Sequence, residues 1–300
     1  MYKLIAIDLD GTLLNSYGEV SEENANAIKK AIENGIEVVL ASGRVYSSVK
    51  NIAKEIGAEN YIISGNGSLV YDMKKDEIIY DQFMDKKKVL DIIRICDENS
   101  IYYNIYTEDT IIAKSINYNV LFYQSENSKK SESKKTKINI VENIYKYVEE
   151  SPNIKILKIT VCDSDKIIFS GIVRKIKTIS KVNVLDISHM SRKIIKHGTE
   201  DVKVEYYYTE VSNENVDKWT AIKFLTNKLE IDENEVVAIG DNANDKQMVM
   251  NAGLGIAMGN SMLDIQKIGD YKVADNNSDG VAEAINKSIL SYYYNYSTKK

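Results

Sequence analysis

The sequence predicts an α/β fold with an inserted domain, on two observations. Apolar runs alternate with segments of helical periodicity at both ends of the chain, and such alternation is typical of βαβ units with right-handed crossovers. The middle of the chain, residues 84–208, instead mixes several β-rich runs with few helices. We therefore expect a Rossmann-like, doubly wound core of parallel strands from residues 1–83 and 209–300, and an inserted α+β cap domain from residues 84–208.

The N-terminal elements begin with a buried strand, predicted from the apolar run Leu4–Ile7. A helix follows between Ser21, a favourable N-cap residue, and Gly35, a favourable C-terminal cap, because apolar residues recur there at helical spacing. The other elements expected in this part are a strand at 36–40, a helix over 49–57 and a strand at 61–63.

The same alternation returns near the C-terminus, whereas the inserted segment is richer in strands. The elements expected near the C-terminus are a helix over 218–229, a strand at 236–239, a helix over 245–251 and a short strand at 255–257. The elements expected in the inserted segment are a helix over 86–96 and strands at 101–106, 110–114, 154–161 and 202–208.

Three features of the chain leave alternatives open. Residues 125–137 are polar and low in complexity, so we expect a mobile loop, with phosphate steering by its lysines as the alternative. Several tyrosines of the inserted segment are expected to pack its sheet, with stacking on an aromatic substrate as the alternative; they are Tyr102, Tyr103, Tyr106, Tyr118 and Tyr123. Tyr292, Tyr293, Tyr294 and Tyr296 would either dock on the core or join an oligomer contact.

Two carboxylates, Asp8 and Asp10, follow the first strand directly in the run Asp-Leu-Asp-Gly-Thr. Ligands of open α/β sheets bind outside the carboxyl ends of the strands, and residues two apart on an extended chain share a side. One acid can then act as a nucleophile while the other transfers protons. The alternative is a turn that uses Asp and Gly for their backbone preferences alone.

Three further segments supply groups that phosphoryl transfer needs. Ser42 and Gly43 follow the second strand, where a hydroxyl and backbone N–H groups can bind phosphate oxygens; a simple strand-to-helix turn is the alternative. Lys218 at a helix start is either a solvated residue or the cation that offsets a phosphorylated aspartate. Asp241 and Asp245 follow a late strand and offer the oxygen ligands that Mg²⁺ prefers.

These segments, in this order, resemble the motifs of the haloacid dehalogenase-like hydrolases, in their Cof-type phosphatase branch. The run that starts at Asp8 is similar to the first motif, Ser42 to the second, Lys218 to the third and residues 240–245 to the fourth. Three secondary signatures, at 64–68, 252–261 and 278–282, agree, and the resemblance covers residues 1–83 and 209–287. The sequence departs from the family pattern at Ser68, usually alanine, and at Trp219, mostly glycine.

The resemblance implies roles for individual residues. Asp8 is the expected nucleophile, Asp10 the general acid and base, and Lys218 the cation that neutralises Asp8 and the phosphoryl group. The expected cofactor is Mg²⁺, bound by the Asp8 carboxylate, the Asp10 carbonyl and Asp241. The resemblance places Asp245 in the outer shell of the metal, where it would hold a metal-bound water or orient Lys218.

The same resemblance implies a group of phosphate-binding residues and two further substrate-binding candidates. The expected phosphate-binding residues are Gly11, Thr12, Ser42, Gly43 and Asn244. Thr12 is also expected to orient Asp10, and Asn244 either touches phosphoryl oxygens or fixes its loop. Arg44 and Asn66 are substrate-binding candidates, and Arg44 alternatively pairs with a surface acid.

Composition narrows the function further. The net charge of −5 argues against nucleic-acid binding. Cys96 and Cys162 lack metal-ligand spacing and are expected to be reduced thiols, and His189 and His197 are too separated to suggest a metal cluster. No run approaches the ~20 apolar residues of a membrane span, and Asp8 interrupts the N-terminal apolar run, unlike a signal peptide. We expect a cytoplasmic protein, monomeric or a small homo-oligomer, without membrane partners.

The expected function is a Mg²⁺-dependent phosphatase for small phosphorylated metabolites, such as sugar phosphates or cofactor precursors, acting through an aspartyl phosphate. A phosphosugar mutase on the same core is the nearest alternative, and a non-catalytic phosphate-sensing protein is another. Phosphorylating ion pumps have threonine at the position of Asp10, so an acid there favours rapid turnover. Dehalogenation does not use the metal cluster implied by Asp10 and Asp241.

Overall fold

The computed structural model describes residues 1–185, 190–197 and 200–290, with the backbone alone at 192–197, 200–202 and 288–290. The chain divides into two compact units. The first comprises residues 1–44, 49–81 and those from 217 onward, and the second comprises residues 45–48 and 82–216. The tyrosines at 292–296 and His189 lie outside the described residues, so the expectations about them stay untested.

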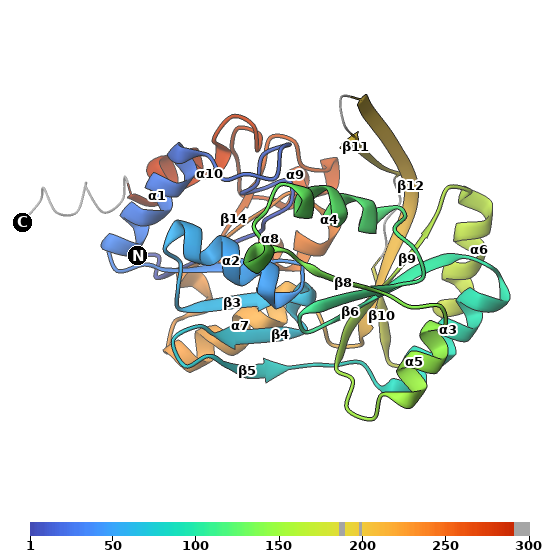
Figure 1. Cartoon of the computed structure of the whole chain (residues 1–300). Coiled ribbons are helices and arrows are strands. Elements are labelled where there is room, and N and C mark those ends of the chain that lie inside the picture. Colours follow the sequence, from blue (N-terminus) through green and yellow to red (C-terminus); the bar gives the residue numbers. More distant parts are fainter. Residues whose placement is uncertain (186–189, 198–199, 291–300) are drawn as a thin grey trace, which may run out of the picture. The chain divides into compact units, whose positions relative to one another are not determined.

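The first unit is built on one sheet, of which Figure 1 labels β3, β4, β5 and β14; its strand order among the described residues is β15-β14-β13-β1-β2-β3-β4-β5. The strands from β15 to β3 run parallel, as predicted, whereas β4 and β5 form an antiparallel edge that the sequence analysis did not foresee. Their bounds are β1 Leu4–Ile7, β2 Glu37–Ala41, β3 Tyr61–Ser64, β4 Leu69–Asp72, β5 Glu77–Asp81, β13 Val236–Gly240, β14 Leu254–Ala257 and β15 Tyr271–Lys272.

Helices pack on both faces of this sheet, as a doubly wound fold requires. Right-handed crossovers place α1 and α2 on one face, where α1 also contacts α10, and α7 packs with α8 on the other. The α7–α8 face closes over a buried cluster that includes Leu4, Val39 and Trp219. The helix bounds are α1 Glu22–Glu33, α2 Tyr46–Ile56, α7 Lys218–Leu229, α8 Lys246–Asn251, α9 Leu263–Ile268 and α10 Gly280–Glu283, and a π-helical segment, Ala284–Leu290, follows.

The predicted capping residues Ser21 and Gly35 lie at the two ends of α1. The Ser21 hydroxyl accepts the N–H of Asn24 at 3.2 Å and caps α1, and Gly35 takes a φ of +78° just beyond its end. Asp217 caps α7 by accepting the N–H of Thr220 at 2.8 Å. This cap makes Lys218 the first residue of α7, which determines where the lysine enters the site.

The order of the strands reverses between β1 and β13. β1 lies between β13 and β2, while the chain reaches β2 by one crossover and β13 only after the inserted unit. Such a switch point leaves a crevice at the carboxyl ends of the two central strands. Asp8 directly follows β1 and Asp241 directly follows β13, so both acids lie at this crevice.

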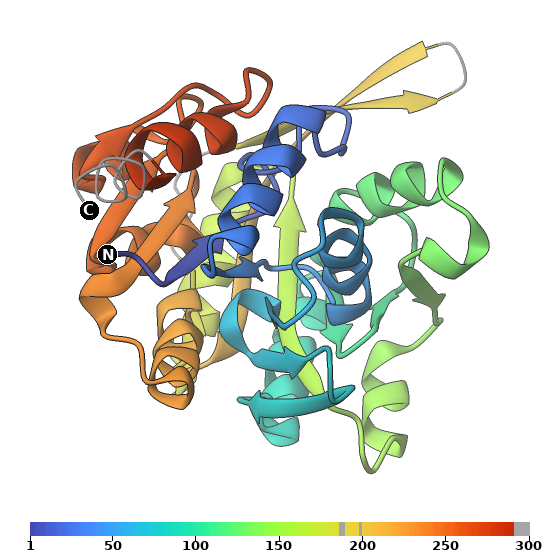
Figure 2. The ribbon, with the colours of Figure 1, turned by 90° about the vertical axis from the view of Figure 1, so that its left-hand side faces the viewer.

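The second unit confirms the predicted inserted α+β domain. Its sheet has the order β10-β12-β9-β6-β7-β8, and β11 pairs with the first part of β12 as a two-stranded ribbon (Figure 2). The strand bounds are β6 Tyr102–Thr107, β7 Thr110–Ala113, β8 Lys137–Ile140, β9 Ile156–Asp163, β10 Val182–Val184, β11 Ser191–His197 and β12 Glu200–Asn213. The helix bounds are α3 Lys86–Glu98, α4 Asn119–Ser128, α5 Ile144–Glu150 and α6 Lys166–Ile176.

Two expectations for this segment are corrected. β12 continues to Asn213 instead of ending at 208, and the second unit extends to 216. The polar stretch 125–137 is not one loop, because its first residues form the last turn of α4 and Lys137 begins β8. Asn127 joins the end of α4 to the start of β8 by two hydrogen bonds. Its side-chain amide donates to the carbonyl of Thr136, and its side-chain oxygen accepts the N–H of Thr136, both at 2.8 Å.

The aromatic and cysteine predictions for the second unit agree with the structure. Tyr102 and Tyr118 place their ring centroids 5.2 Å apart, and Tyr106 and Tyr123 place theirs 6.1 Å apart. Tyr102 and Tyr106 lie on β6, whereas Tyr123 lies on α4 and Tyr118 directly precedes it, so these rings pack between the sheet and α4. Cys96 and Cys162 are both free thiols, and both are buried.

Candidate active site

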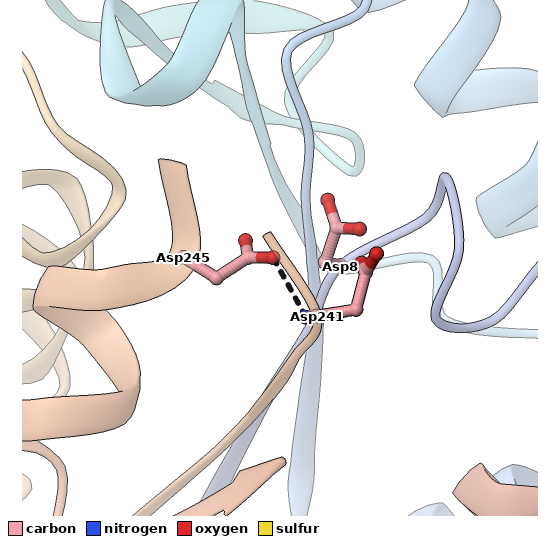
Figure 3. Close-up of side chains that lie close together, drawn as sticks. All are labelled: Asp8, Asp241 and Asp245. Atoms are coloured by element: carbon pink, nitrogen blue, oxygen red, sulfur yellow. Dashed lines mark hydrogen bonds between the residues drawn. The ribbon is translucent and has the colours of Figure 1, made fainter. Parts of the chain in front are cut away.

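Three carboxylates from three separate segments converge in the first unit. Asp8 follows β1, Asp241 follows β13, and Asp245 ends the 3-10 turn Ala243–Asp245 that leads into α8 (Figure 3). All three are buried, and each offers an oxygen within 4.8 Å of those of the other two. Oxygen ligands so arranged suit a hard divalent cation such as Mg²⁺.

Lys218 is the cation that the structure places among these acids. Its ammonium group, fully buried, donates to Asp245 Oδ1 at 2.6 Å and to Asp8 Oδ1. The cap of α7 at Asp217 aims the lysine at the strand ends. The structure therefore brings Lys218 into hydrogen-bond contact with Asp8, the residue whose charge it is expected to neutralise, and with Asp245.

Burial and mutual repulsion oppose full ionisation of the cluster. Burial, together with the charges of Asp245 and Asp10, raises the pKa of Asp8 to about 7 even though Lys218 lowers it. Burial and the charges of Asp8 and Asp245 likewise raise the pKa of Asp241. Burial alone would lower the pKa of Lys218, but Asp245 and Asp8 outweigh it, so its pKa stays above the ordinary value. A bound cation would relieve this repulsion, which makes the donor set fit Mg²⁺.

Hydrogen bonds orient two of the three acids. Asp245 Oδ2 accepts the backbone N–H of Asp241 at 2.9 Å and that of Asn242 at 3.0 Å (Figure 3). The Thr12 hydroxyl donates to Asp241 Oδ1 at 2.9 Å. The expectation that Thr12 orients Asp10 is therefore wrong: its side chain is fully buried and turned toward Asp241.

Gly11 is required by a close approach as well as by its backbone angle. Its φ is +90°, and a Cβ placed there would lie 2.4 Å from Asp241 Oδ2. The glycine of the first motif thus lets the loop after β1 lie directly against Asp241.

Ser42, Gly43 and Arg44 directly follow β2. Ser42 is buried, and its hydroxyl accepts the N–H of Arg44 at 3.2 Å. Its backbone N–H donates to Ile63 and its carbonyl accepts from Asn66, both at 3.0 Å. Ser42 and Gly43 are therefore held rigidly at the end of β2.

Asn66 and Asn244 are brought together across the site. The side-chain amide of Asn244 donates to Asn66 Oδ1 at 3.0 Å, which supports the prediction that Asn244 fixes its loop. Asn66 itself takes a φ of +60°, and a Cβ at Gly67 would lie 2.1 Å from the carbonyl oxygen of Asp217. The turn after β3 thus packs directly on the start of α7.

Arg44 pairs with Asp10. Its side chain is 1% exposed, and it donates from Nε to Asp10 Oδ2 at 2.9 Å and from Nη2 to Asp10 Oδ1 at 2.7 Å. Arg44 was expected to contact the substrate or a surface acid; the structure pairs it with Asp10, the residue expected to transfer protons.

Two asparagines that the sequence analysis did not single out hold the loop after β1. Asn260 donates from its side chain to the carbonyl of Gly11 at 2.8 Å, and Asn276 donates to that of Leu14 at 2.8 Å. The N–H of Asn276 also bonds Asn260 Oδ1 at 3.1 Å. The only sequence signal was the secondary signature at 252–261, which carried no role for the asparagine.

Comparison with known proteins identifies the family of the chain. The family model of the haloacid dehalogenase-like hydrolases matches residues 5–285. The chain is 30% identical to the phosphatase YwpJ of Bacillus subtilis over 93% of this chain and 97% of that protein. It is 28% identical to the 5-amino-6-(5-phospho-D-ribitylamino)uracil phosphatase YcsE of the same organism, over 96% of each.

Solved structures show the same fold. A haloacid dehalogenase-like hydrolase from B. subtilis superposes with a TM-score of 0.79 at 28% identity, covering 95% of this chain and 99% of that one. Another from Bacteroides thetaiotaomicron gives a TM-score of 0.77 at 26% identity, covering 96% of this chain and 100% of that one. Among the described residues, no helix is long and apolar enough to cross a membrane. The chain belongs to the haloacid dehalogenase-like hydrolases and is a phosphatase of their Cof-type branch.

Proposed function

We propose that this phosphatase hydrolyses small phosphorylated metabolites through a phosphorylated Asp8, with Mg²⁺ as its cofactor. The observation that carries the proposal is the buried cluster of Asp8, Asp241 and Asp245 around the Lys218 ammonium. A nucleophilic carboxylate, a fixed cation and further oxygen ligands are what transfer of a phosphoryl group to an aspartate needs.

The carboxylates of Asp8 and Asp241 would hold the metal, with the Asp10 carbonyl as a third protein ligand. Asp245 belongs to the outer shell, because its oxygens accept hydrogen bonds from Lys218 and from two backbone N–H groups. When bound, Mg²⁺ offsets the negative charge of the phosphoryl group and of the two carboxylates.

The phosphoryl group would bind between the loop after β1 and the end of β2. The Ser42 hydroxyl can donate its proton to a phosphate oxygen, because its own oxygen already accepts the N–H of Arg44. The backbone N–H groups of Gly11 and Gly43 are further donors, and the Lys218 ammonium bonded to Asp8 adds positive charge.

In the first step an Asp8 carboxylate oxygen attacks phosphorus in line. The bond from phosphorus to the ester oxygen breaks, and the leaving alcohol takes a proton from Asp10. Lys218 stabilises the charge of the aspartyl phosphate, because its ammonium already bonds Asp8 and is excluded from water.

In the second step Asp10, now a carboxylate, takes a proton from an incoming water. The water oxygen attacks phosphorus and the bond from phosphorus to Asp8 breaks, which releases inorganic phosphate and restores Asp8. The proton taken from water leaves Asp10 ready to protonate the next leaving group, so the two steps balance.

One relative and the inserted domain support the proposed substrate class. YcsE acts on a phosphorylated ribityl compound by its name, so a sugar phosphate or a phosphorylated cofactor precursor is the class we propose. The inserted α+β unit is proposed to act as a cap that selects among these and excludes water.

The test is phosphate release from a panel of sugar phosphates, nucleotides and cofactor precursors, with and without Mg²⁺. Asp8→Asn is compared with wild type and with Asp264→Asn, a control acid of the same unit whose side chain is 80% exposed. We expect Mg²⁺-dependent release that Asp8→Asn abolishes and Asp264→Asn leaves intact. Asp8→Asn activity above about a tenth of wild type would refute the nucleophile. Interconversion of sugar phosphates without release would indicate a mutase instead.

A further inference from the structure

Arg44 and Asp10 form a pair whose two side chains differ in burial. The Arg44 side chain is 1% exposed and the Asp10 side chain 41% exposed. Two hydrogen bonds, of 2.9 and 2.7 Å, join the guanidinium fork to both carboxylate oxygens. This bidentate geometry determines the position of the carboxylate and also the orientation of its plane.

Arg44 is the rigid member of the pair. Its N–H donates to Ser42 Oγ at 3.2 Å, and its carbonyl accepts the N–H of Gly65 at 3.0 Å, so its backbone is attached to the ends of β2 and β3. Asp10 instead lies in the loop that leaves β1, with a side chain that is partly open to solvent. The buried arginine therefore supports the exposed acid.

We propose that Arg44 is a positioning residue that holds Asp10 for proton transfer, through both oxygens when Asp10 is a carboxylate and through one when the other carries the proton for the leaving alcohol, and that it is not a ligand of the substrate phosphate. The proposal rests on the function proposed above for Asp10. An Asp side chain rotates about two bonds, and a misplacement of about 1 Å costs on the order of 10²-fold in rate. Lysine keeps the charge of Arg44 but not its fork, so it cannot orient the plane of the carboxylate.

The choice of leaving group in the substrate distinguishes a positioning role of Arg44 from a role in phosphate binding. An alkyl phosphate needs a proton from Asp10 when its alcohol departs, whereas p-nitrophenyl phosphate releases a stable phenolate without one. A variant that misplaces Asp10 therefore slows transfer from the alkyl ester more than from the phenyl ester. A variant that loses a phosphate ligand weakens binding of both esters equally.

The experiment measures kcat and KM for one alkyl phosphate and for p-nitrophenyl phosphate, with rapid-mixing measurement of the first phosphoryl transfer. The proteins are wild type, Arg44→Lys, Arg44→Gln, Asp10→Asn and the double variant Arg44→Lys with Asp10→Asn. Arg94→Lys is the matched control, because Arg94 is 54% exposed and pairs with Asp91 on α3. Thermal unfolding gives the folded fraction by which each rate is divided.

We expect Arg44→Lys to lower kcat for the alkyl ester on the order of 10²-fold, with KM changed less than about threefold. The first transfer from p-nitrophenyl phosphate should fall much less, and the double variant should be no slower than Asp10→Asn alone. Arg44→Gln should resemble Arg44→Lys, since neither has the charged fork, and Arg94→Lys should match wild type.

Equal losses on both esters, a raised KM with weaker inhibition by inorganic phosphate, or effects that add to those of Asp10→Asn would overturn the proposal. The proposed function fails separately. If Asp8→Asn keeps its activity, the nucleophile is wrong whatever Arg44 does. If Asp8→Asn and Asp10→Asn are inactive while both Arg44 variants match wild type, only the positioning role is wrong.

Discussion

The Thr12 hydroxyl donates a hydrogen bond to Asp241 Oδ1 at 2.9 Å, although the two residues are 229 positions apart in the chain. The bond joins the loop after β1 to the end of β13. Thr12, in the loop that follows the proposed nucleophile, therefore orients Asp241, a proposed metal ligand. Groups that orient a ligating carboxylate contribute to metal affinity without touching the metal.

Replacing Thr12 by valine keeps the shape of the side chain and removes this bond. We expect Thr12→Val to weaken Mg²⁺ binding about 10- to 100-fold, because Asp241 loses the donor that orients it. Titration calorimetry with Mg²⁺ measures the dissociation constant. Thr12→Ser, which keeps the hydroxyl, is the control and should stay near wild type, and equal affinities for all three proteins would contradict the prediction.

Replacing Lys218 by methionine leaves two buried carboxylates without their cation. We expect Lys218→Met to abolish turnover and to lower the free energy of unfolding by about 3–5 kcal/mol in the absence of Mg²⁺. Urea unfolding checks the second expectation. Lys223→Met is the control on the same helix, since Lys223 is 48% exposed, and should change stability by less than about 0.5 kcal/mol.

Gly11→Ala and Gly35→Ala separate a steric effect from backbone strain. Both glycines have a positive φ, +90° at Gly11 and +78° at Gly35. A Cβ at Gly11 lies 2.4 Å from Asp241 Oδ2, whereas nothing lies within 4 Å of one at Gly35. We expect both variants to be destabilised by strain and only Gly11→Ala to lose Mg²⁺ affinity and activity. Equal activity losses at equal folded fraction would show that the clash is irrelevant.

The raised pKa of Asp8 predicts how pH affects stability and metal binding. Since this pKa is about 7 in the folded protein and about 4 in an unfolded chain, the folded metal-free protein binds more protons between these values. Its stability therefore falls as pH rises through that window. Mg²⁺ must displace the same proton, so the metal-induced rise in melting temperature should grow from pH 5.5 to about 7.5 and then level off. Thermal unfolding with and without Mg²⁺ tests this, and a rise independent of pH would contradict it.

The local sequence was sufficient for the elements that carry the catalytic groups. Apolar runs followed by Asp8 and by Asp241 predicted two strands, and the structure has them as β1 and β13. The helix predicted to begin at Lys218 is α7, with the same bounds. These features depend on burial of neighbouring residues and on capping within a few positions, which are properties of a short window of sequence.

Other features depended on residues far apart in the chain. The antiparallel edge β4–β5 and the extension of β12 to Asn213 are stabilised by pairing with neighbouring strands. The local periodicity of apolar residues does not predict which strand a segment will pair with. The role of Thr12 was predicted wrongly for the same reason, since its partner belongs to a strand at the other end of the chain.

Residue patterns along the chain were enough to predict the α/β core, the inserted domain and the acids and lysine that meet in the first unit. The folded chain was needed to show which side chains bond to one another: Arg44 to Asp10, Thr12 to Asp241, and Lys218 to both Asp8 and Asp245. The physical reason is that residue type and spacing set what a side chain can do, whereas the order of strands in the sheet sets which side chains come within hydrogen-bonding distance.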